Sequence, residues 1–144
     1  MTSAAIADAL GGKKVLGQAV RSYAELAELT RRGLPADSLT ALGEKLDLNQ
    51  AALSAKVGIP PRTLTRRLSR HSRLTAAESD RTVRLARVYA TAVEMIGNEE
   101  KASQWLRTPN RALAGKVPLD QLDTDLGAKE VENILGRIAY GVYS

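Results

Sequence analysis

The sequence contains no cysteine and no phenylalanine, and it has only one tryptophan, four tyrosines and one histidine in 144 residues. Without cysteine the chain forms no disulfide and offers no thiolate as a metal ligand or nucleophile. With so few aromatic rings, its core must be built from Leu, Val, Ile and Ala. No run approaches the roughly 18 consecutive apolar residues of a membrane span, and the first residues lack the long apolar core of a secretory signal. We therefore expect a cytoplasmic protein with no membrane partner.

Candidate catalytic groups are equally scarce. His71 stands among arginines with no acid or nucleophile partner in the sequence pattern. Asp120, Asp123 and Asp125 precede a predicted helix, where carboxylates more often stabilise the N-terminus, and they lack the Gly and Glu positions of a calcium loop. The stretch 11–14, GGKK, falls far short of a phosphate-binding loop. We predict no enzyme, no metal site and no cofactor.

Positive charge is concentrated in one segment. Residues 56–87 carry nine of the 21 basic side chains and two of the 16 acidic ones, whereas the flanking regions are near neutral or slightly acidic. A solvated helix face normally mixes both signs, but Lys56–Arg73 contains no acidic residue. The block therefore indicates a surface for a polyanion, of which nucleic acid is the first candidate.

Capping and breaking residues predict a chain of helices with no convincing strand. Ser22-x-x-Glu25 and Thr75-x-x-Glu78 are capping boxes. Further helix-start signals are Pro35, Asn49, Pro60-Pro61 and Asn98. A short helix is expected after Thr108-Pro109, and the last helix is expected to begin near Gly127. We expect an all-α fold in which the helix over about 76–96 contains or adjoins the domain boundary.

Residues 48–70 predict a helix-turn-helix. A helix with Leu53 and Val57 on one face is followed by a glycine turn at Gly58, and the next helix turns Leu64 and Leu68 inward. The opposite face of that second helix is arginine and hydroxyl, the side chains that contact phosphates and base edges. The candidate DNA-binding residues are Gln50, Arg62, Thr63, Thr65, Arg66, Ser69 and Arg70.

The spacing of Gln50 and Gly58 resembles the helix-turn-helix of Xre-type regulators. Two positions depart from that pattern: Ser54 stands where a small alanine is usual, and Arg67 where an apolar residue is expected. We expect Leu68 to supply the packing that Arg67 does not. Helix-turn-helix pairs also occur as structural corners, and the arginine face is what favours DNA here. Arg81, Arg84 and Arg87 on the following helix are expected to face solvent or phosphate.

The end of the chain places two of the four tyrosines within five residues. On the last helix Val131, Ile134, Leu135 and Ile138 form one apolar stripe, and Tyr140 lies nearly opposite to it. Large amphipathic rings outside a core are typical of partner contacts. The alternative is that they cover a neighbouring helix of the same chain, and the pattern alone does not choose.

Residues 105–144 carry a more distinctive pattern. It comprises Trp105-Leu106, Thr108-Pro109-Asn110 with Ala112-Leu113, Gly115 with Pro118-Leu119-Asp120 and Leu122, and LGRIAYGV over Leu135–Val142. This run resembles the toxin-binding domain of Xre/MbcA/ParS-type antitoxins. The likeness extends to 78–88 and 33–39.

The resemblance implies an N-terminal helix-turn-helix DNA-binding domain over 1–90 and a small helical toxin-binding domain over 91–144. It implies a cognate RES-domain toxin that consumes NAD⁺ and whose active-site entrance the antitoxin covers. It also implies toxin contacts by Trp105, Asn110, Arg137, Tyr140, Tyr143 and Ser144.

The sequence thus predicts an antitoxin that neutralises its toxin by contact and represses its own operon on double-stranded operator DNA. Because one helix-turn-helix reads one half-site, a homodimer or a larger assembly with toxin is expected. The rival hypotheses are a free-standing transcription regulator with a ligand-sensing C-terminal domain, and an interaction protein that does not bind DNA.

Overall fold

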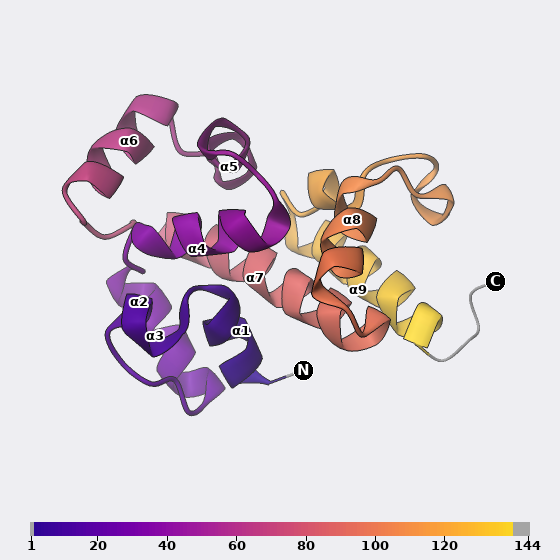
Figure 1. The fold of residues 1–144 in the computed structure, drawn as a ribbon, viewed down its shortest axis with the longest axis horizontal. Coiled ribbons are helices and arrows are strands. Elements are labelled where there is room, and N and C mark those ends of the chain that lie inside the picture. The colour runs from indigo at the N-terminus through magenta and orange to yellow at the C-terminus, as the bar shows by residue number, and fades with distance from the viewer. Residues whose placement is uncertain (1, 140–144) are drawn as a thin grey trace.

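The computed structural model describes residues 2–139, which form nine α-helices and two short 3₁₀ helices with no β-strand among them (Figure 1). The fold is all-α, as predicted. In chain order the elements are α1 (Ser3–Ala9), α2 (Gly12–Leu16), α3 (Tyr23–Arg32), α4 (Asp37–Leu46), α5 (Gln50–Val57), α6 (Pro61–Ser69), α7 (Ala76–Ile96), α8 (Glu99–Arg107), η1 (Arg111–Leu113), η2 (Pro118–Gln121) and α9 (Asp125–Ala139).

The predicted start signals act as caps in the structure. The Ser22 hydroxyl accepts a hydrogen bond from the Glu25 backbone N–H at 3.1 Å, and the Asn49 side chain accepts one from Ala52 at 2.9 Å. Thr75 and Glu78 form both hydrogen bonds of a capping box. Each cap satisfies a backbone donor that a helix start leaves free. The predicted helices over 23–32, 50–57 and 76–96 are confirmed.

Three features differ from the sequence prediction. Helices α1 and α2 were not expected; Thr2 caps α1 by accepting from the Ala5 N–H. The short helix predicted after Thr108-Pro109 is instead η1, because the Asn110 side chain accepts from the Ala112 N–H and starts the turn there. The last helix begins at Asp125, two residues earlier than Gly127.

Helix α7 is the central element of the fold. It packs against α1 and α3 on one side and against α8 and α9 on the other, so it passes through both halves of the molecule (Figure 1). The core around it is aliphatic, as expected, with leucines such as Leu39, Leu42 and Leu85 almost wholly buried. The predicted division at residue 90 falls inside this helix and remains a prediction.

Candidate nucleic-acid and partner interfaces

Helices α5 and α6 meet at a tight turn. Gly58 ends α5 with a φ of 68°, a left-handed conformation that suits glycine, and Ile59 in the turn is 2% exposed. Leu64 is fully buried, and Leu68 packs partly buried against the core, as expected from the arginine at position 67. The apolar side of α6 is thereby fixed to the domain, and the remaining side faces outward.

That outward side carries three free arginines. Arg62, Arg66 and Arg70 are exposed and lie four residues apart, about one helical turn. Among the described residues, no hydrogen bond or ion pair engages their side chains. Ser69 is exposed beside them, while Thr63 is half-buried. Three unpaired guanidinium groups on one helix face are able to bind an anion without first breaking a contact within the chain.

Two of the predicted DNA-binding residues contact each other. The Gln50 side-chain amide donates to the Thr65 hydroxyl at 2.7 Å, and that hydroxyl donates to the Pro61 carbonyl at 3.0 Å. Both residues are exposed. The pair joins the start of α5 to α6, so the structure places Gln50 and Thr65 at the same edge as the arginines.

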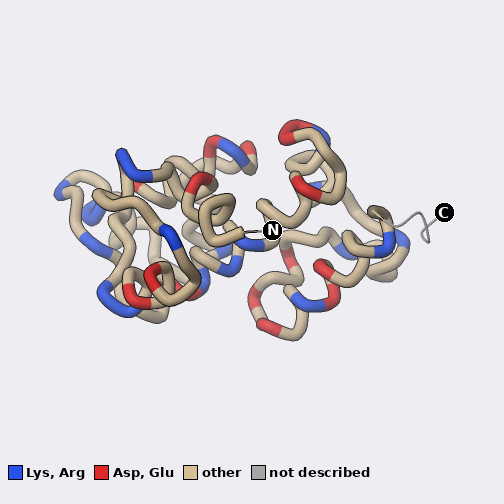
Figure 2. The backbone as a smooth tube through the Cα atoms, turned by 90° about the horizontal axis from the view of Figure 1, so that it is seen from below, with Lys and Arg blue, Asp and Glu red and all other residues tan. Residues whose placement is uncertain are grey.

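The other six cations of the basic segment are used within the chain. Their partners lie on neighbouring elements: Lys56 with Asp120, Arg67 with Glu78, Arg73 with the Gly33 carbonyl, Arg81 with the Val57 carbonyl, Arg84 with the Leu122 and Asp123 carbonyls, and Arg87 with Glu132. The basic side chains that remain free for a polyanion are therefore fewer than the sequence indicated, and they lie on α6. Figure 2 shows Lys and Arg at the end of the molecule that carries α6, together with some Asp and Glu.

The expectation that Arg81, Arg84 and Arg87 face solvent or phosphate was wrong. Arg81 donates from Nε to the Val57 carbonyl at 2.6 Å, which fixes α7 to the end of α5. Arg84 reaches the segment that leads into α9, 3.2 Å from the Leu122 carbonyl, and Arg87 contacts Glu132 within α9 at 3.0 Å. Besides Asp80 on the same helix, the partners of Arg84 and Arg87 lie about forty residues further along the chain, which a helical wheel does not show.

The predicted toxin-binding residues occupy different environments. Arg137 is exposed on α9, with no partner among the described residues. Trp105 is half-buried against the core, and Asn110 caps η1 and pairs with Lys116 in an isolated bridge. Val131, Ile134 and Leu135 are fully buried and Ile138 is partly buried, which confirms the predicted stripe of the last helix. Tyr140, Tyr143 and Ser144 lie outside the described residues.

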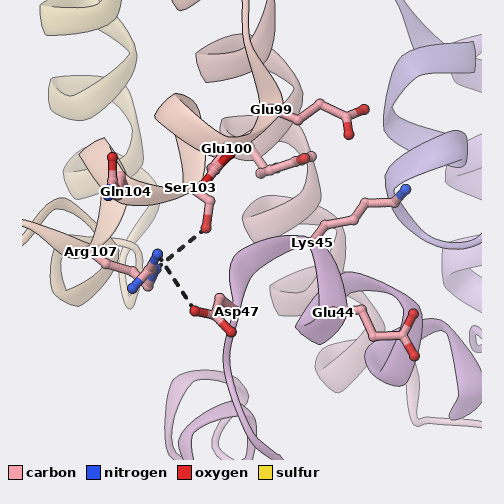
Figure 3. A pocket seen from close by; sticks show the side chains of 9 residues that line it. Glu44, Lys45, Asp47, Glu99, Glu100, Ser103, Gln104 and Arg107 are labelled. Carbon is pink, nitrogen blue, oxygen red and sulfur yellow. Dashed lines mark hydrogen bonds and ion pairs between the residues drawn. The ribbon is translucent and has the colours of Figure 1, made fainter.

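A charged cleft of about 730 Å³ lies where the end of α4 meets α8 (Figure 3). Arg107 of α8 donates to the Ser103 hydroxyl at 3.4 Å and lies 3.8 Å from Asp47 after α4. At its wall, burial raises the pKa of Tyr89, and the nearby charge of Glu99 raises it further. The cleft is thus a polar junction between the two halves of the molecule.

Within residues 2–139, no group of three or more His, Cys, Asp or Glu side chains is arranged to hold a metal ion. In the same range, no helix is both long and apolar enough to cross a membrane.

Comparison with known proteins assigns a family to each half of the chain. Residues 25–87 match the antitoxin Xre-like helix-turn-helix domain, and residues 91–141 match the antitoxin Xre/MbcA/ParS C-terminal toxin-binding domain. The free arginines of α6 lie within the first match, and Arg137 lies within the second.

Comparison with whole proteins indicates the same family. The chain is 34% identical over 120 residues to an antitoxin Xre of Yersinia enterocolitica, covering 83% of this chain and 81% of that protein. It is 33% identical over 132 residues to an antitoxin Xre of Photorhabdus laumondii, covering 91% and 89%. Its fold is similar to a chain in the crystal structure of the M. tuberculosis MbcT-MbcA toxin-antitoxin complex, with a TM-score of 0.57, 25% identity, and coverage of 76% of this chain and 96% of that one. The chain belongs to the Xre antitoxin family, with a helix-turn-helix domain followed by a toxin-binding domain.

Proposed function

We propose that this antitoxin binds operator DNA through α5 and α6 and thereby represses its own operon. One observation carries the DNA half: of nine basic side chains in residues 56–87, the three on the outward face of α6 have no partner among the described residues, while the other six do. Arginine in a major groove donates two hydrogen bonds to guanine or one or more to phosphate. Gln50, Thr63, Thr65 and Ser69 lie on or beside this face and are the proposed supporting contacts.

The partner of the C-terminal domain is proposed to be a RES-domain toxin that degrades NAD⁺. The antitoxin neutralises it by covering its active site, so this chain acts by binding and not by catalysis, without a cofactor, in the cytoplasm. Support comes from the toxin-binding family match over 91–141 and from a structural relative solved in a toxin-antitoxin complex. The RES and NAD⁺ assignments rest on the sequence resemblance. The proposed contacts are Trp105, Asn110, Arg137, Tyr140, Tyr143 and Ser144.

The DNA proposal is tested by fluorescence anisotropy with labelled DNA from upstream of the gene. Arg62→Ala or Arg66→Ala should weaken binding by roughly 1–3 kcal/mol and change sequence preference if the arginine reads a base. An arginine on phosphate should instead weaken all sequences alike and flatten the salt dependence. Arg31→Ala is the control, since Arg31 is exposed on α3 beside Glu28. Unchanged affinity in an Arg62/Arg66 double variant would contradict the assignment of α6.

The toxin proposal is tested by co-expression with the cognate RES-domain toxin. Tyr140→Ala with Tyr143→Ala leaves the buried stripe of α9 intact, so the melting temperature and operator binding should persist while neutralisation fails. Interface aromatics often contribute upward of about 2 kcal/mol each. A large fall in melting temperature with toxin binding retained would show that the tyrosines serve this chain's own core. A chain that binds operator but neutralises no toxin would support the free-standing regulator.

We also propose that two copies act together on DNA. A single helix-turn-helix reads one half-site, and useful specificity comes from two half-sites about one DNA turn apart. Sedimentation with operator and toxin present should show a homodimer or a larger hetero-oligomer. A monomer under those conditions would refute this part.

A further inference from the structure

Leu126 is the most exposed large apolar side chain in the described part of the protein. It is 81% exposed at the start of α9, and Tyr23 on α3, at 56%, is the other large hydrophobic residue that is exposed there. The remaining large apolar residues of α9 up to Leu135 are fully buried. Leu126 therefore contributes almost nothing to the core, although every other leucine of the described residues is buried or partly buried.

The backbone next to Leu126 packs tightly against η2. Gly127 lies so near η2 that an added Cβ would stand 1.9 Å from the Gln121 carbonyl oxygen. Its N–H donates to the Thr124 hydroxyl at 2.9 Å, which caps the helix start. Because Gly127 is fixed against η2, the start of α9 cannot easily rotate to bring the Leu126 side chain into the core. The Leu126 side chain is therefore directed away from the protein.

Arg84 and Arg87 of α7 also contact the start of α9 and the segment before it. Arg84 donates to the carbonyls of Leu122 and Asp123 at 3.2 and 3.3 Å. Arg87 contacts Glu132 at 3.0 Å and lies 3.8 Å from Asp125. These contacts order the approach to α9 and its first two turns before any partner arrives. An apolar group presented on an ordered backbone binds with a smaller entropy cost than one on a mobile loop.

Leu126 begins a continuous exposed face of α9. Glu130, Asn133 and Arg137 follow it by four, seven and eleven residues, and all three are exposed. At about 100° per residue the four side chains fall within an arc of about 60°, on the side away from the buried stripe. None of the four has a side-chain partner among the described residues. In the sequence, Tyr140 continues the same spacing.

We propose that Leu126 is an apolar anchor for the toxin and that the face from Leu126 to Arg137 is part of the toxin-binding surface. This inference rests on the proposed function, and it extends the predicted contacts by eleven residues toward the start of α9. The partner surface would have an apolar depression at Leu126, with a basic group facing Glu130 and an acidic group facing Arg137.

The toxin, and not a second copy of this chain, is the proposed occupant for two reasons. The face is continuous with Arg137 and lies within residues 91–141, which match a toxin-binding domain. One helix face of about three turns also buries far less than the roughly 800 Å² per partner of a stable protein interface. It therefore suits an added contact in a larger complex better than a dimer on its own.

The experiment measures binding of the full-length chain to the cognate RES-domain toxin, purified in a catalytically inactivated form. Leu126→Ala should raise the Kd at least about tenfold, the loss expected when a buried leucine is cut back. Leu126→Asp should raise it further, and Leu126→Met should restore most of the affinity. The melting temperature of the free chain should not change, because the side chain is 81% exposed. Tyr23→Ala is the matched control, an exposed hydrophobic residue on the other half, and should bind as the parent does.

The outcomes separate this inference from the proposed function. If the parent chain binds the toxin and Leu126→Asp binds equally well, the anchor is wrong and the antitoxin function stands. If the parent binds no toxin, the proposed function itself fails. If Leu126→Asp instead changes the sedimentation of the free chain and leaves the toxin affinity unchanged, a second copy covers this face and the inference is overturned.

Discussion

Arg67 on α6 and Glu78 in the first turn of α7 form an ion pair, with side chains only 18% and 12% exposed. Glu78 also accepts a hydrogen bond from the Thr75 backbone N–H at 2.8 Å as part of the capping box. One carboxylate therefore caps α7 and fixes the end of the proposed DNA-reading helix. This explains why an arginine occupies a position where an apolar residue was expected.

Arg67→Ala should lower the free energy of unfolding by roughly 1–3 kcal/mol, because it leaves a mostly buried carboxylate with fewer partners. Its neighbour Arg66 is exposed and unpaired among the described residues, so Arg66→Ala should leave unfolding almost unchanged and weaken operator binding. Urea denaturation and DNA anisotropy on both variants provide the comparison. Equal stability losses in the two variants would mean that the ion pair does not position α6.

The same carboxylate makes stability depend on pH. Burial alone would raise the pKa of Glu78, but the hydrogen bond from Thr75 and the hydrogen bond and charge of Arg67 outweigh it and hold the pKa below 4.5. Because the folded-state pKa is depressed, this contribution is complete above about pH 4.5 and is lost as the pH falls through the folded-state value. The stability difference between the parent and Glu78→Gln should therefore shrink as the pH falls below 4.5. Chemical denaturation from pH 7 down to pH 3 measures it, and a difference that stays constant would contradict the assignment.

Ser54, the other departure from the helix-turn-helix pattern, is 2% exposed, and its hydroxyl has no hydrogen-bond partner among the described residues. Ser54→Ala should stabilise the protein by about 1 kcal/mol, since it removes an unsatisfied hydroxyl and improves helix propensity. Operator affinity should not change, because the side chain does not reach the surface. Ser69→Ala, on an exposed position of α6, is the control and should shift the melting temperature by much less. A loss of stability in Ser54→Ala would indicate that the hydroxyl has a partner after all.

The sequence predicted the fold well where the signals were local. Ser22, Asn49 and Thr75 marked helix starts because each cap lies three residues before its backbone donor. Helices α1 and α2 were missed because the first is alanine-rich with no clear stripe and the second spans five residues after two glycines.

The part of the candidate site that depends on local sequence signals was also predicted. The outward face of α6 follows from its own periodicity, and Arg62, Arg66 and Arg70 lie there as expected. The internal roles of Arg84 and Arg87 depend on Leu122 and Glu132, which only the packing of α7 against α9 brings near. The sequence did not predict that Leu126 is exposed, because a single apolar residue at a helix start carries no pattern that separates an exposed side chain from a buried one.

The two glycines of α9 should respond in opposite directions to the same change. At Gly127 an added Cβ would stand 1.9 Å from the Gln121 carbonyl oxygen, so either the helix start or η2 must move. Overpacking against backbone typically costs about 1–3 kcal/mol, and Gly127→Ala should therefore lower the melting temperature.

At Gly136 nothing in the described structure lies within 4 Å of an added Cβ. Alanine in a helix interior is favoured over glycine by roughly 0.5–1 kcal/mol, so Gly136→Ala should raise the melting temperature. Toxin affinity is a second readout. Gly127→Ala displaces the helix start that carries Leu126 and should therefore weaken toxin binding. If the substitution affected only thermal stability, the Kd for the toxin would stay unchanged at a temperature where both variants are folded. If both substitutions stabilise the chain, the close approach of α9 to η2 is wrong, and with it the fixed direction of Leu126.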